Sequence, residues 1–305
     1  MAHQQFSESM EASLPTTLSL AVSIMSGAGN LFTVLDARHA IIPREQEHHI
    51  ARQACEQYGT DGFLVIDASH THALHFSMRY YNADGSSGSM CGNGGRCAVE
   101  FAMKKGLIVS SATNIAFDCI GHTYHAEYLA ESYIRLVFPA PMQCDYPRHI
   151  VFDDAQYGII GLTIGYVDVG VEHCVVYYPE LGTQTRQSFD VFDIDYYGSI
   201  LRHHKEFPQG SNVNFYTITG ENILKVRTYE RGVERETGAC GSGAIATALI
   251  AMLRHDMMMP THIVPTSGSV LTISAMPSND AIDSLSLQGH AEILREERLS
   301  VPMNF

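Results

Sequence analysis

Two short stretches decide the fold of this chain: Met90-Cys91-Gly92-Asn93-Gly94-Gly95-Arg96-Cys97 and Ala239-Cys240-Gly241-Ser242-Gly243-Ala244. Both contain Cys-Gly-x-Gly, and both run into a segment of helical character. They lie about half a chain length apart in 305 residues, which is far too long a spacing for the stacked repeats of a solenoid. The sequence therefore predicts two similar halves, each presenting one motif.

The residues before the two motifs also match each other. Leu74–Tyr81 alternates in polarity like a strand and is followed by the turn residues Asn82–Gly85. Ile223–Tyr229 alternates in the same way and is followed by Glu230-Arg231-Gly232. Each half is thus expected to run from a strand through a polar turn to the motif and then into a helix.

The two expected helices differ in polarity. Ala244–Leu253 contains no charged residue, and a helix that is apolar on every side is buried on every side. This segment is too short to span a membrane, so we expect sheet to surround it. The first helix, about Gly94–Lys105, is more amphipathic and is expected to end before Gly106.

Short strand-like runs surround these helices, beginning with Leu18–Met25, whereas Gln143–Ile160 shows no clear pattern. We expect an α/β (α+β) fold of two pseudo-symmetric lobes, each a curved, mostly antiparallel sheet wrapped around one central helix. The other expected strands are Phe32–Leu35, Gly62–Ile66, Ile134–Phe138, Gly161–Val169, Cys174–Tyr178, Asn212–Ile218 and Val270–Ser274.

Composition excludes several classes of function. Lys and Arg number 19 against 33 Asp and Glu, a formal net charge of −14. That balance argues against sequence-independent binding of nucleic acid and against an anionic membrane surface. The seven cysteines are an odd number, and no positively charged leader precedes the first apolar run. We therefore expect free thiols and a cytoplasmic location.

The cysteine that opens each motif is placed for chemistry. The free N–H groups and dipole at a helix N-terminus favour a thiolate there, and the glycines let these amides approach an anion closely. If the halves face each other, the thiols of Cys91 and Cys240 flank one substrate. One thiolate then removes a proton from a carbon while the other thiol protonates the opposite face, which in principle needs no cofactor.

Other readings of the motifs are weaker. The spacing of Cys91 and Cys97 does not match a zinc knuckle, and Gly27-Ala28-Gly29 lacks the third glycine of a dinucleotide-binding loop. No metal site is expected. The remaining cysteines are interpreted as small buried hydrophobes: Cys55, Cys97, Cys119, Cys144 and Cys174.

The two motifs and their surroundings closely resemble the signatures of the diaminopimelate epimerase family. The resemblance rests on blocks that occur in the family's order between about residues 24 and 250. Besides the motif regions Asn82–Cys97 and Tyr229–Gly243, these blocks are Ser26-Gly27-Ala28-Gly29-Asn30-Leu31-Phe32, Gly59-Thr60-Asp61-Gly62 and His203…Phe207-Pro208…Asn212-Val213-Asn214-Phe215.

The resemblance implies a cofactor-independent isomerase that interconverts LL- and meso-diaminopimelate in lysine and peptidoglycan precursor synthesis. It implies one lobe of residues 1–139 with 284–305 and a second of residues 140–283, and it is compatible with a homodimer. The catalytic thiols fall on Cys91 and Cys240, with His173 and Glu230 as auxiliary groups. Substrate contacts fall on Asn30, Asn82, Gly92, Asn93, Asn212, Glu230, Arg231, Gly241 and Ser242.

The chain also departs from the family's pattern. Val171-Glu172 precedes His173 where the family usually has a small or polar residue and then Pro, and about 16 N-terminal residues extend beyond the usual start. Val171 raises the alternative of a racemase with broader amino-acid specificity, for example for glutamate. An isomerase of a cyclic imino acid, a thiol hydrolase or peroxidatic enzyme, and an inactive binding protein are the remaining alternatives.

Overall fold

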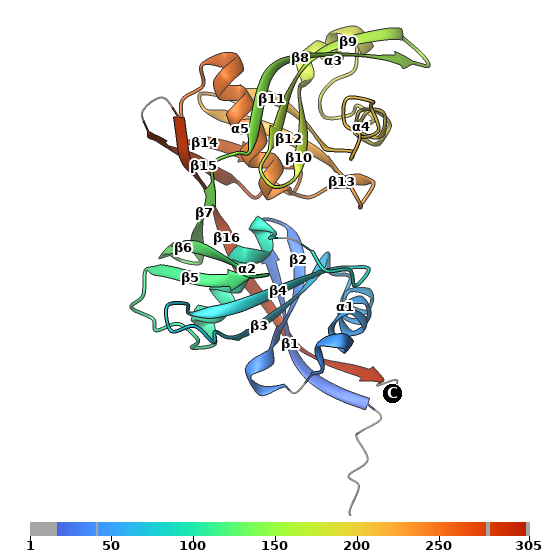
Figure 1. The fold of residues 1–305 in the computed structure, drawn as a ribbon. Helices are drawn as coiled ribbons and strands as arrows, with labels where there is room; N and C mark the ends of the chain where they lie inside the picture. Colours follow the sequence, from blue (N-terminus) through green and yellow to red (C-terminus); the bar gives the residue numbers. More distant parts are fainter. Residues whose placement is uncertain (1–16, 41, 89, 279–280, 303–305) are drawn as a thin grey trace, which may run out of the picture.

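The chain folds into two lobes, one above the other in Figure 1, and one long helix passes through the interior of each. The computed structural model describes residues 17–40, 42–88, 90–278 and 281–302. The described residues form one sixteen-stranded sheet that continues from one lobe into the other. The expected α+β class with two lobes and a helix at the centre of each is confirmed.

The first lobe is a closed barrel. Its strands follow the order β1-β2-β3-β4-β5-β6-β7-β16, and β16 pairs back onto β1. Helix α1 (Arg44–Tyr58) packs outside the barrel, and α2 (Gly92–Lys104) lies inside it. The strands are β1 (Thr17–Gly27), β2 (Asn30–Asp36), β3 (Gly62–Ala68), β4 (Phe76–Asn82), β5 (Asn114–Cys119), β6 (His122–Ala130), β7 (Tyr133–Pro139) and β16 (Ala281–Pro302).

The second lobe continues the sheet from β16 in the order β15-β14-β12-β11-β10-β9-β8, with β13 paired to β12. Its central helix is α5 (Gly241–His255), and α3 (Tyr178–Thr185) and α4 (Ile194–Arg202) pack on other strands of the lobe. The strands are β8 (Gln143–Asp154), β9 (Gly158–Asp168), β10 (Glu172–Tyr177), β11 (Asn212–Gly220), β12 (Ile223–Glu230), β13 (Arg235–Thr237), β14 (Thr261–Val264) and β15 (Leu271–Ser278).

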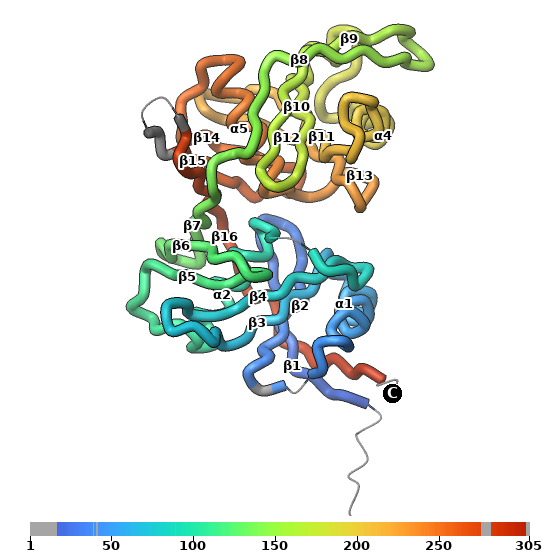
Figure 2. Tube along the Cα trace, viewed as in Figure 1, coloured from blue at the N-terminus to red at the C-terminus, as the bar shows by residue number. Residues whose placement is uncertain are grey.

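Strand β16 belongs to both lobes. Its first part pairs with β15 of the second lobe and with β7, whereas residues 291–302 pair with β1. Figure 2 shows this red segment descending from the upper lobe to lie beside the blue N-terminal strand. The strand therefore joins the two lobes through backbone hydrogen bonds. The expected boundaries after residues 139 and 283 stay a prediction.

Both central helices are enclosed by sheet. In α5, the residues from Gly243 to Ala251 are buried, as expected for a segment without charges. Helix α2 is also buried from Gly92 to Ala102, including Arg96 and Glu100, so its expected exposed polar face is absent. The reason is that the closed barrel surrounds α2, so the side chains of Arg96 and Glu100 lie inside the protein.

Several elements had no clear sequence signal. The unassigned stretch forms the β8–β9 hairpin, in which the register shifts between Asp145 and Arg148, next to Pro147. The shift disturbs the period of two that would mark a strand. Helices α1, α3 and α4 are short or strongly polar, and neighbouring strands cover only part of their surface.

The burial of α5 predicts a large difference between two leucines of this helix. Leu249 is 1% exposed inside the second lobe, whereas Leu253 is 48% exposed. Leu249→Ala is expected to lower the free energy of unfolding by about 2–5 kcal/mol, because it leaves a cavity among enclosed side chains. Urea denaturation followed by circular dichroism measures this loss.

Leu253→Ala is the matched control, since it makes the same substitution in the same helix. It is expected to change the free energy of unfolding by less than about 0.5 kcal/mol. Similar losses for the two variants would contradict the enclosure of α5 by the sheet.

Candidate active site

The N-termini of α2 and α5 meet between the lobes. A Cβ atom added to Gly241 would lie 3.6 Å from the Cα of Gly92, and 3.0 Å from a methyl group of Leu287 on β16. A Cβ added to Gly92 would lie 2.7 Å from the same methyl group. Only glycine leaves room for these two helix starts to approach each other over Leu287.

Cys91 and Cys240 occupy equivalent places at these helix starts. Each is the N-cap residue, and its Sγ accepts a hydrogen bond from the third backbone N–H of the helix, Gly94 or Gly243, at 3.4 Å in both cases. The Sγ of Cys240 also lies 3.5 Å from the Oγ of Ser242. All seven cysteines of the chain are free thiols.

The two thiols influence each other's ionisation. Burial raises the pKa of Cys91, while the N–H groups of Gly94 and Asn93 lower it. Burial is also the main reason for the raised pKa of Cys240, and the charge of Cys91 raises it further. Because a thiolate at one cysteine disfavours a thiolate at the other, the pair is suited to hold one negative charge.

Asn93 links the two lobes above the helix starts. Its Nδ2 donates to Oδ1 of Asn30 at 2.5 Å in the first lobe and to the carbonyl of Ala239 at 3.2 Å in the second. Nearby, the hydroxyl of Ser267 donates to the carbonyl of Ala28 at 2.8 Å. These contacts between segments far apart in the sequence hold the lobes against each other at the thiols.

His173 lies on β10 and is completely buried. Burial, with a smaller contribution from Arg231, lowers its pKa to about 3, so the imidazole is neutral near pH 7. The amide nitrogen of Asn214 donates to Nδ1 of His173 at 3.0 Å and to the carbonyl of Cys174 at 3.3 Å. Since a carbonyl only accepts, the orientation of this amide is fixed and the ring proton is on Nε2.

Nε2 of His173 has no hydrogen-bond partner among the described residues. A buried N–H without a partner costs free energy. The ring therefore offers one fixed donor that a bound molecule can satisfy. Asn214 itself sits against the start of α5, since a Cβ added to Gly243 would lie 2.2 Å from its Oδ1.

The end of β12 places an acidic residue, Glu230, next to a basic residue, Arg231. Burial raises the pKa of Glu230, whose carboxylate accepts a hydrogen bond from the hydroxyl of Thr237. The charge of Glu230 in turn raises the pKa of Cys240. Arg231 donates through Nη1 to the carbonyls of Gln209 and Gly210, at 3.2 and 3.1 Å. Its other guanidinium nitrogens make no hydrogen bond within the described residues.

The predicted contact residues are only partly brought together. Asn212 accepts from the backbone N–H of Arg231 at 2.8 Å, which fixes the turn. Asn30 reaches Asp61 as well as Asn93. Asn82 donates to Oγ of Ser86 at 2.9 Å, and no contact in the described part of the chain joins it to the thiols. The site roles of these residues stay predictions.

Two neighbours of the thiols had no assigned role in the sequence. Tyr80 lies two residues before Asn82 on β4, and burial strongly raises its pKa, with contributions from the charges of Cys91 and Glu230. Asn214 has the role described above at His173. The sequence predicts a strand around each of these residues. That either residue lies near a thiol follows only from segments that are distant in the chain and meet in the fold.

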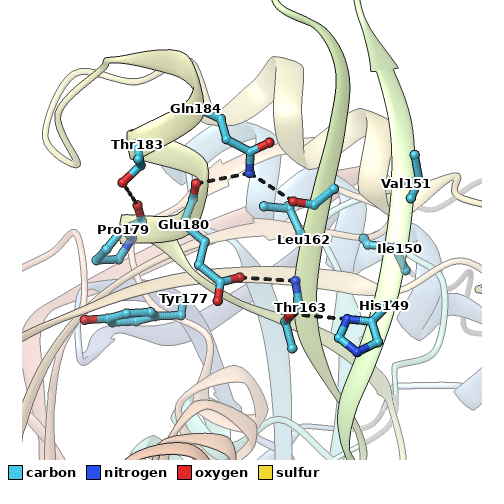
Figure 3. A pocket seen from close by; sticks show the side chains of 11 residues that line it. His149, Ile150, Val151, Leu162, Thr163, Tyr177, Pro179, Glu180, Thr183 and Gln184 are labelled. Atoms are coloured by element: carbon cyan, nitrogen blue, oxygen red, sulfur yellow. Dashed lines mark hydrogen bonds between the residues drawn. The ribbon is translucent and has the colours of Figure 1, made fainter.

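A groove of about 650 Å³ lies elsewhere, on the second lobe between β8, β9 and α3 (Figure 3). Glu180 lines the groove and accepts from the backbone N–H of Thr163, while Gln184 donates to the carbonyl of Gly161. None of the predicted site residues lines this groove. It is therefore separate from the thiol pair.

The described residues contain no group of three or more His, Cys, Asp or Glu side chains that could hold a metal ion. None of their helices is both long and apolar enough to cross a membrane.

Solved structures share this fold at low sequence identity. A phenazine biosynthesis protein of the PhzF family from Bacillus anthracis superposes with a TM-score of 0.69 at 14% identity, covering 92% of this chain and 99% of that protein. A hydroxyproline epimerase from Agrobacterium vitis superposes with a TM-score of 0.68 at 13% identity and 93% coverage of both chains. These similarities support the fold alone.

Similarity in sequence identifies the family as well as the fold. The family model described as diaminopimelate epimerase matches residues 22–118 and 165–294. The diaminopimelate epimerase of Chlorobaculum tepidum is 37% identical over 272 residues, which are 88% of this chain and 96% of that protein. The diaminopimelate epimerase of Aquifex aeolicus is 31% identical, over 90% of this chain and 96% of that protein. The chain therefore belongs to the diaminopimelate epimerase family.

Proposed function

We propose that this protein is an isomerase that interconverts LL-2,6-diaminopimelate and meso-diaminopimelate by proton transfer at an α-carbon. The observation that carries the proposal is the meeting of two N-cap thiols, Cys91 and Cys240, at facing helix starts between the lobes. A pair of thiols on opposite sides of one carbon is what inversion by two bases requires. Family membership supplies the substrate.

The proton balance of the reaction is simple. The thiolate of one cysteine removes the α-proton and becomes a thiol, and the electron pair of the broken C–H bond stays on the substrate as a carbanion. The thiol of the other cysteine then protonates the opposite face and becomes the thiolate. No proton is gained or lost overall, and the reverse reaction exchanges the roles of Cys91 and Cys240. The proposal includes no cofactor and no metal.

The backbone N–H groups at the helix starts stabilise the carbanion. The α-carboxylate would rest on the amides around Gly92-Asn93 and Gly241-Ser242, where both helix dipoles favour negative charge. Charge that moves from the α-carbon into this carboxylate during the reaction meets the same donors. The burial of Gly92, Asn93 and Gly241 strengthens these interactions, because charges interact more strongly away from water.

His173 and Glu230 complete the reacting centre in this proposal. The neutral imidazole of His173 offers its Nε2–H to the substrate and cannot compete with a thiol as an acid. The charge of Glu230 raises the pKa of Cys240, which favours the protonated form of that thiol. The two auxiliary groups therefore differ, although the two cysteines occupy equivalent positions.

The far end of the substrate carries a second ammonium and a second carboxylate. The free guanidinium nitrogens of Arg231 suit that carboxylate, and the carboxylate of Glu230 suits the ammonium. The side-chain amides of Asn30, Asn82 and Asn212 supply further donors and acceptors. Together these groups match an extended molecule with two amino-acid ends better than a short one.

We also propose a reducing, cytoplasmic location and a homodimer. The mechanism needs both thiols of the pair in reduced form, which a reducing compartment maintains. Size-exclusion chromatography with light scattering decides the oligomeric state.

The two-thiol mechanism predicts that either cysteine is indispensable. Cys91→Ala and Cys240→Ala are each expected to lower the rate of epimerisation by at least about 10²–10⁴-fold, because each removes one acid–base group. Conversion of LL- to meso-diaminopimelate in D₂O, with deuterium incorporation at the α-carbon followed by NMR, measures the effect. Cys144→Ala, which changes a free thiol outside the pair, is the matched control and should keep wild-type activity.

Full epimerisation by either single variant would refute the two-base mechanism. Loss of activity in the Cys144→Ala control would show that the other losses reflect disturbed folding. Circular dichroism of all three variants tests that explanation directly.

The groups proposed for the far end of the substrate also predict which amino acids the protein accepts. The wild-type protein is expected to epimerise diaminopimelate, and to leave glutamate and 4-hydroxyproline unchanged, since neither offers a second amino-acid end for Arg231 and Glu230. Chiral chromatography after incubation with each compound measures the outcome. Racemisation of glutamate at a comparable rate would support the broader racemase instead, with Val171 as the first position to vary.

The burial of His173 predicts a pH-dependent stability. Its pKa in the folded protein, about 3, lies below the value of about 6.5 for an unfolded chain. Below pH 6.5 the unfolded state therefore binds a proton that the folded state does not. Each pH unit between about 6 and 4 should cost about 1.4 kcal/mol of stability through this residue.

Urea denaturation of the wild type and of His173→Gln at pH 7, 6, 5 and 4 measures this contribution. The advantage of the wild type over the variant should shrink as the pH falls, because glutamine does not titrate. The exposed His203 provides His203→Gln as a control for the substitution itself. An advantage over His173→Gln that does not change with pH would contradict a buried neutral imidazole.

A further inference from the structure

Arg96 is a buried cation inside the first lobe. Its side chain is 0% exposed and is among the largest fully buried side chains of the described chain. It lies on α2 and turns back toward the helix start, where Nη1 donates to the carbonyl of Gly92 at 3.1 Å and Nη2 donates to Oδ1 of Asn93 at 2.8 Å. No carboxylate of the described residues forms an ion pair with it.

Such a group is expensive to bury. A charge taken out of water without an opposite charge loses much of its solvation energy, and Nε of Arg96 even lacks a hydrogen-bond partner in the described part of the chain. Burial lowers the pKa of Arg96 to about 10, so the guanidinium still carries its charge near pH 7. The first lobe therefore keeps a positive charge beside the start of α2.

The second lobe has an apolar residue at the equivalent place. The residue five positions after Cys240, which corresponds to Arg96 after Cys91, is Ile245, and it is 1% exposed. The strands before the two motifs differ in charge at their last residue. Strand β4 of the first lobe ends at the neutral Asn82, whereas β12 of the second lobe ends at the acidic Glu230. The pseudo-symmetry of the backbone is thus broken by a cation near one thiol and an anion near the other.

We propose that Arg96 is a positioning residue that decides which thiol is ionised in the resting protein: its buried guanidinium at the start of α2 makes Cys91 the thiolate and leaves Cys240 the thiol. The proposal rests on the two-thiol mechanism above and deepens it. Arg96 does not touch the substrate, and it acts through the helix start and Asn93.

The groups around the two thiols agree with this assignment. The titratable groups coupled to Cys91 by charge are Arg96 and Cys97 on its own helix, Glu230 from β12, and Tyr80, Cys119 and Cys240 from other elements. The charge of Glu230 raises the pKa of Cys91, and that of Arg96 lowers it. Arg96 is the only cation in that set. At Cys240, burial and the charge of Glu230 raise the pKa and favour the protonated thiol.

Arg96 has a second effect through Asn93. Because Nη2 of Arg96 occupies the amide oxygen of Asn93, the amide nitrogen is turned toward Asn30 and toward the carbonyl of Ala239 in the other lobe. The same guanidinium therefore supplies the charge near Cys91 and orients the side chain that joins the lobes. Lysine could keep the charge but could not keep the forked pair of hydrogen bonds.

The test is a titration of one thiol at a time without substrate. Cys91 is followed in a Cys240→Ser background by thiolate absorbance near 240 nm, after subtraction of the curve of the variant that lacks both thiols. Arg96→Met, which removes the charge, is expected to raise the pKa of Cys91 by about one unit or more. Arg96→Lys should shift it by less than half as much.

Ile245→Met is the matched control, since it makes a buried apolar substitution at the corresponding place in α5 and should leave the pKa of Cys91 unchanged. A kinetic measurement adds a second criterion. In Arg96→Met the acid limb of the profile of kcat/KM against pH should move to higher pH by the same amount as the thiol pKa. In Arg96→Lys the limb should move by less than half as much, and KM should rise, because Asn93 loses its orientation.

An unchanged pKa of Cys91 in folded Arg96→Met would overturn the proposal, as would a titration in which Cys240 has the lower pKa in the wild type. If Arg96→Met does not fold, Arg96→Gln removes the charge while keeping hydrogen-bond donors, and the same shift is expected. The proposed reaction fails separately, if the wild type does not epimerise diaminopimelate, whereas the thiol titration needs no substrate.

Discussion

The close approach of two helix starts, at Gly92 and Gly241, is the constraint on which the rest of the site depends. Each helix is enclosed by its own sheet along most of its length, and its N-terminus faces the other lobe. Two positive dipole ends that point at each other repel, and this repulsion is relieved by a negative charge between them. The architecture of the fold by itself therefore favours a negative charge at this place.

Connections between distant parts of the chain keep these helix starts in place. Strand β16 pairs with β15 in one lobe and with β1 in the other, and it carries Leu287 beneath both glycines. Asn93 ties the lobes together on the side of the thiols. Because these contacts surround the thiol pair, small changes in the relative position of the lobes would change the distance between the thiols, on which proton transfer through a carbon depends.

The backbone is nearly symmetric, but the chemistry is not. Both cysteines receive the same hydrogen bond from the same position of their helix, whereas the surrounding side chains differ: Arg96 is near the first thiol, and Glu230 is near the second. In the proposed mechanism one cysteine starts as the base and the other as the acid, and unequal surroundings favour the thiolate at one of them. The duplicated backbone supplies the geometry, and the unequal side chains make the two thiols differ in acidity.

The sequence by itself determined the duplicated motifs, the two central helices, most of the strands that surround them and the identity of the paired cysteines. These features depend on local patterns, such as a helix without charges or a glycine after a cysteine. Only the tertiary structure decided that the first sheet closes into a barrel, that Asn214 fixes the imidazole of His173, and that Arg96 is buried without a carboxylate partner in the described residues. Each of these depends on segments that are far apart in the chain and meet in space, and no local periodicity encodes such a meeting.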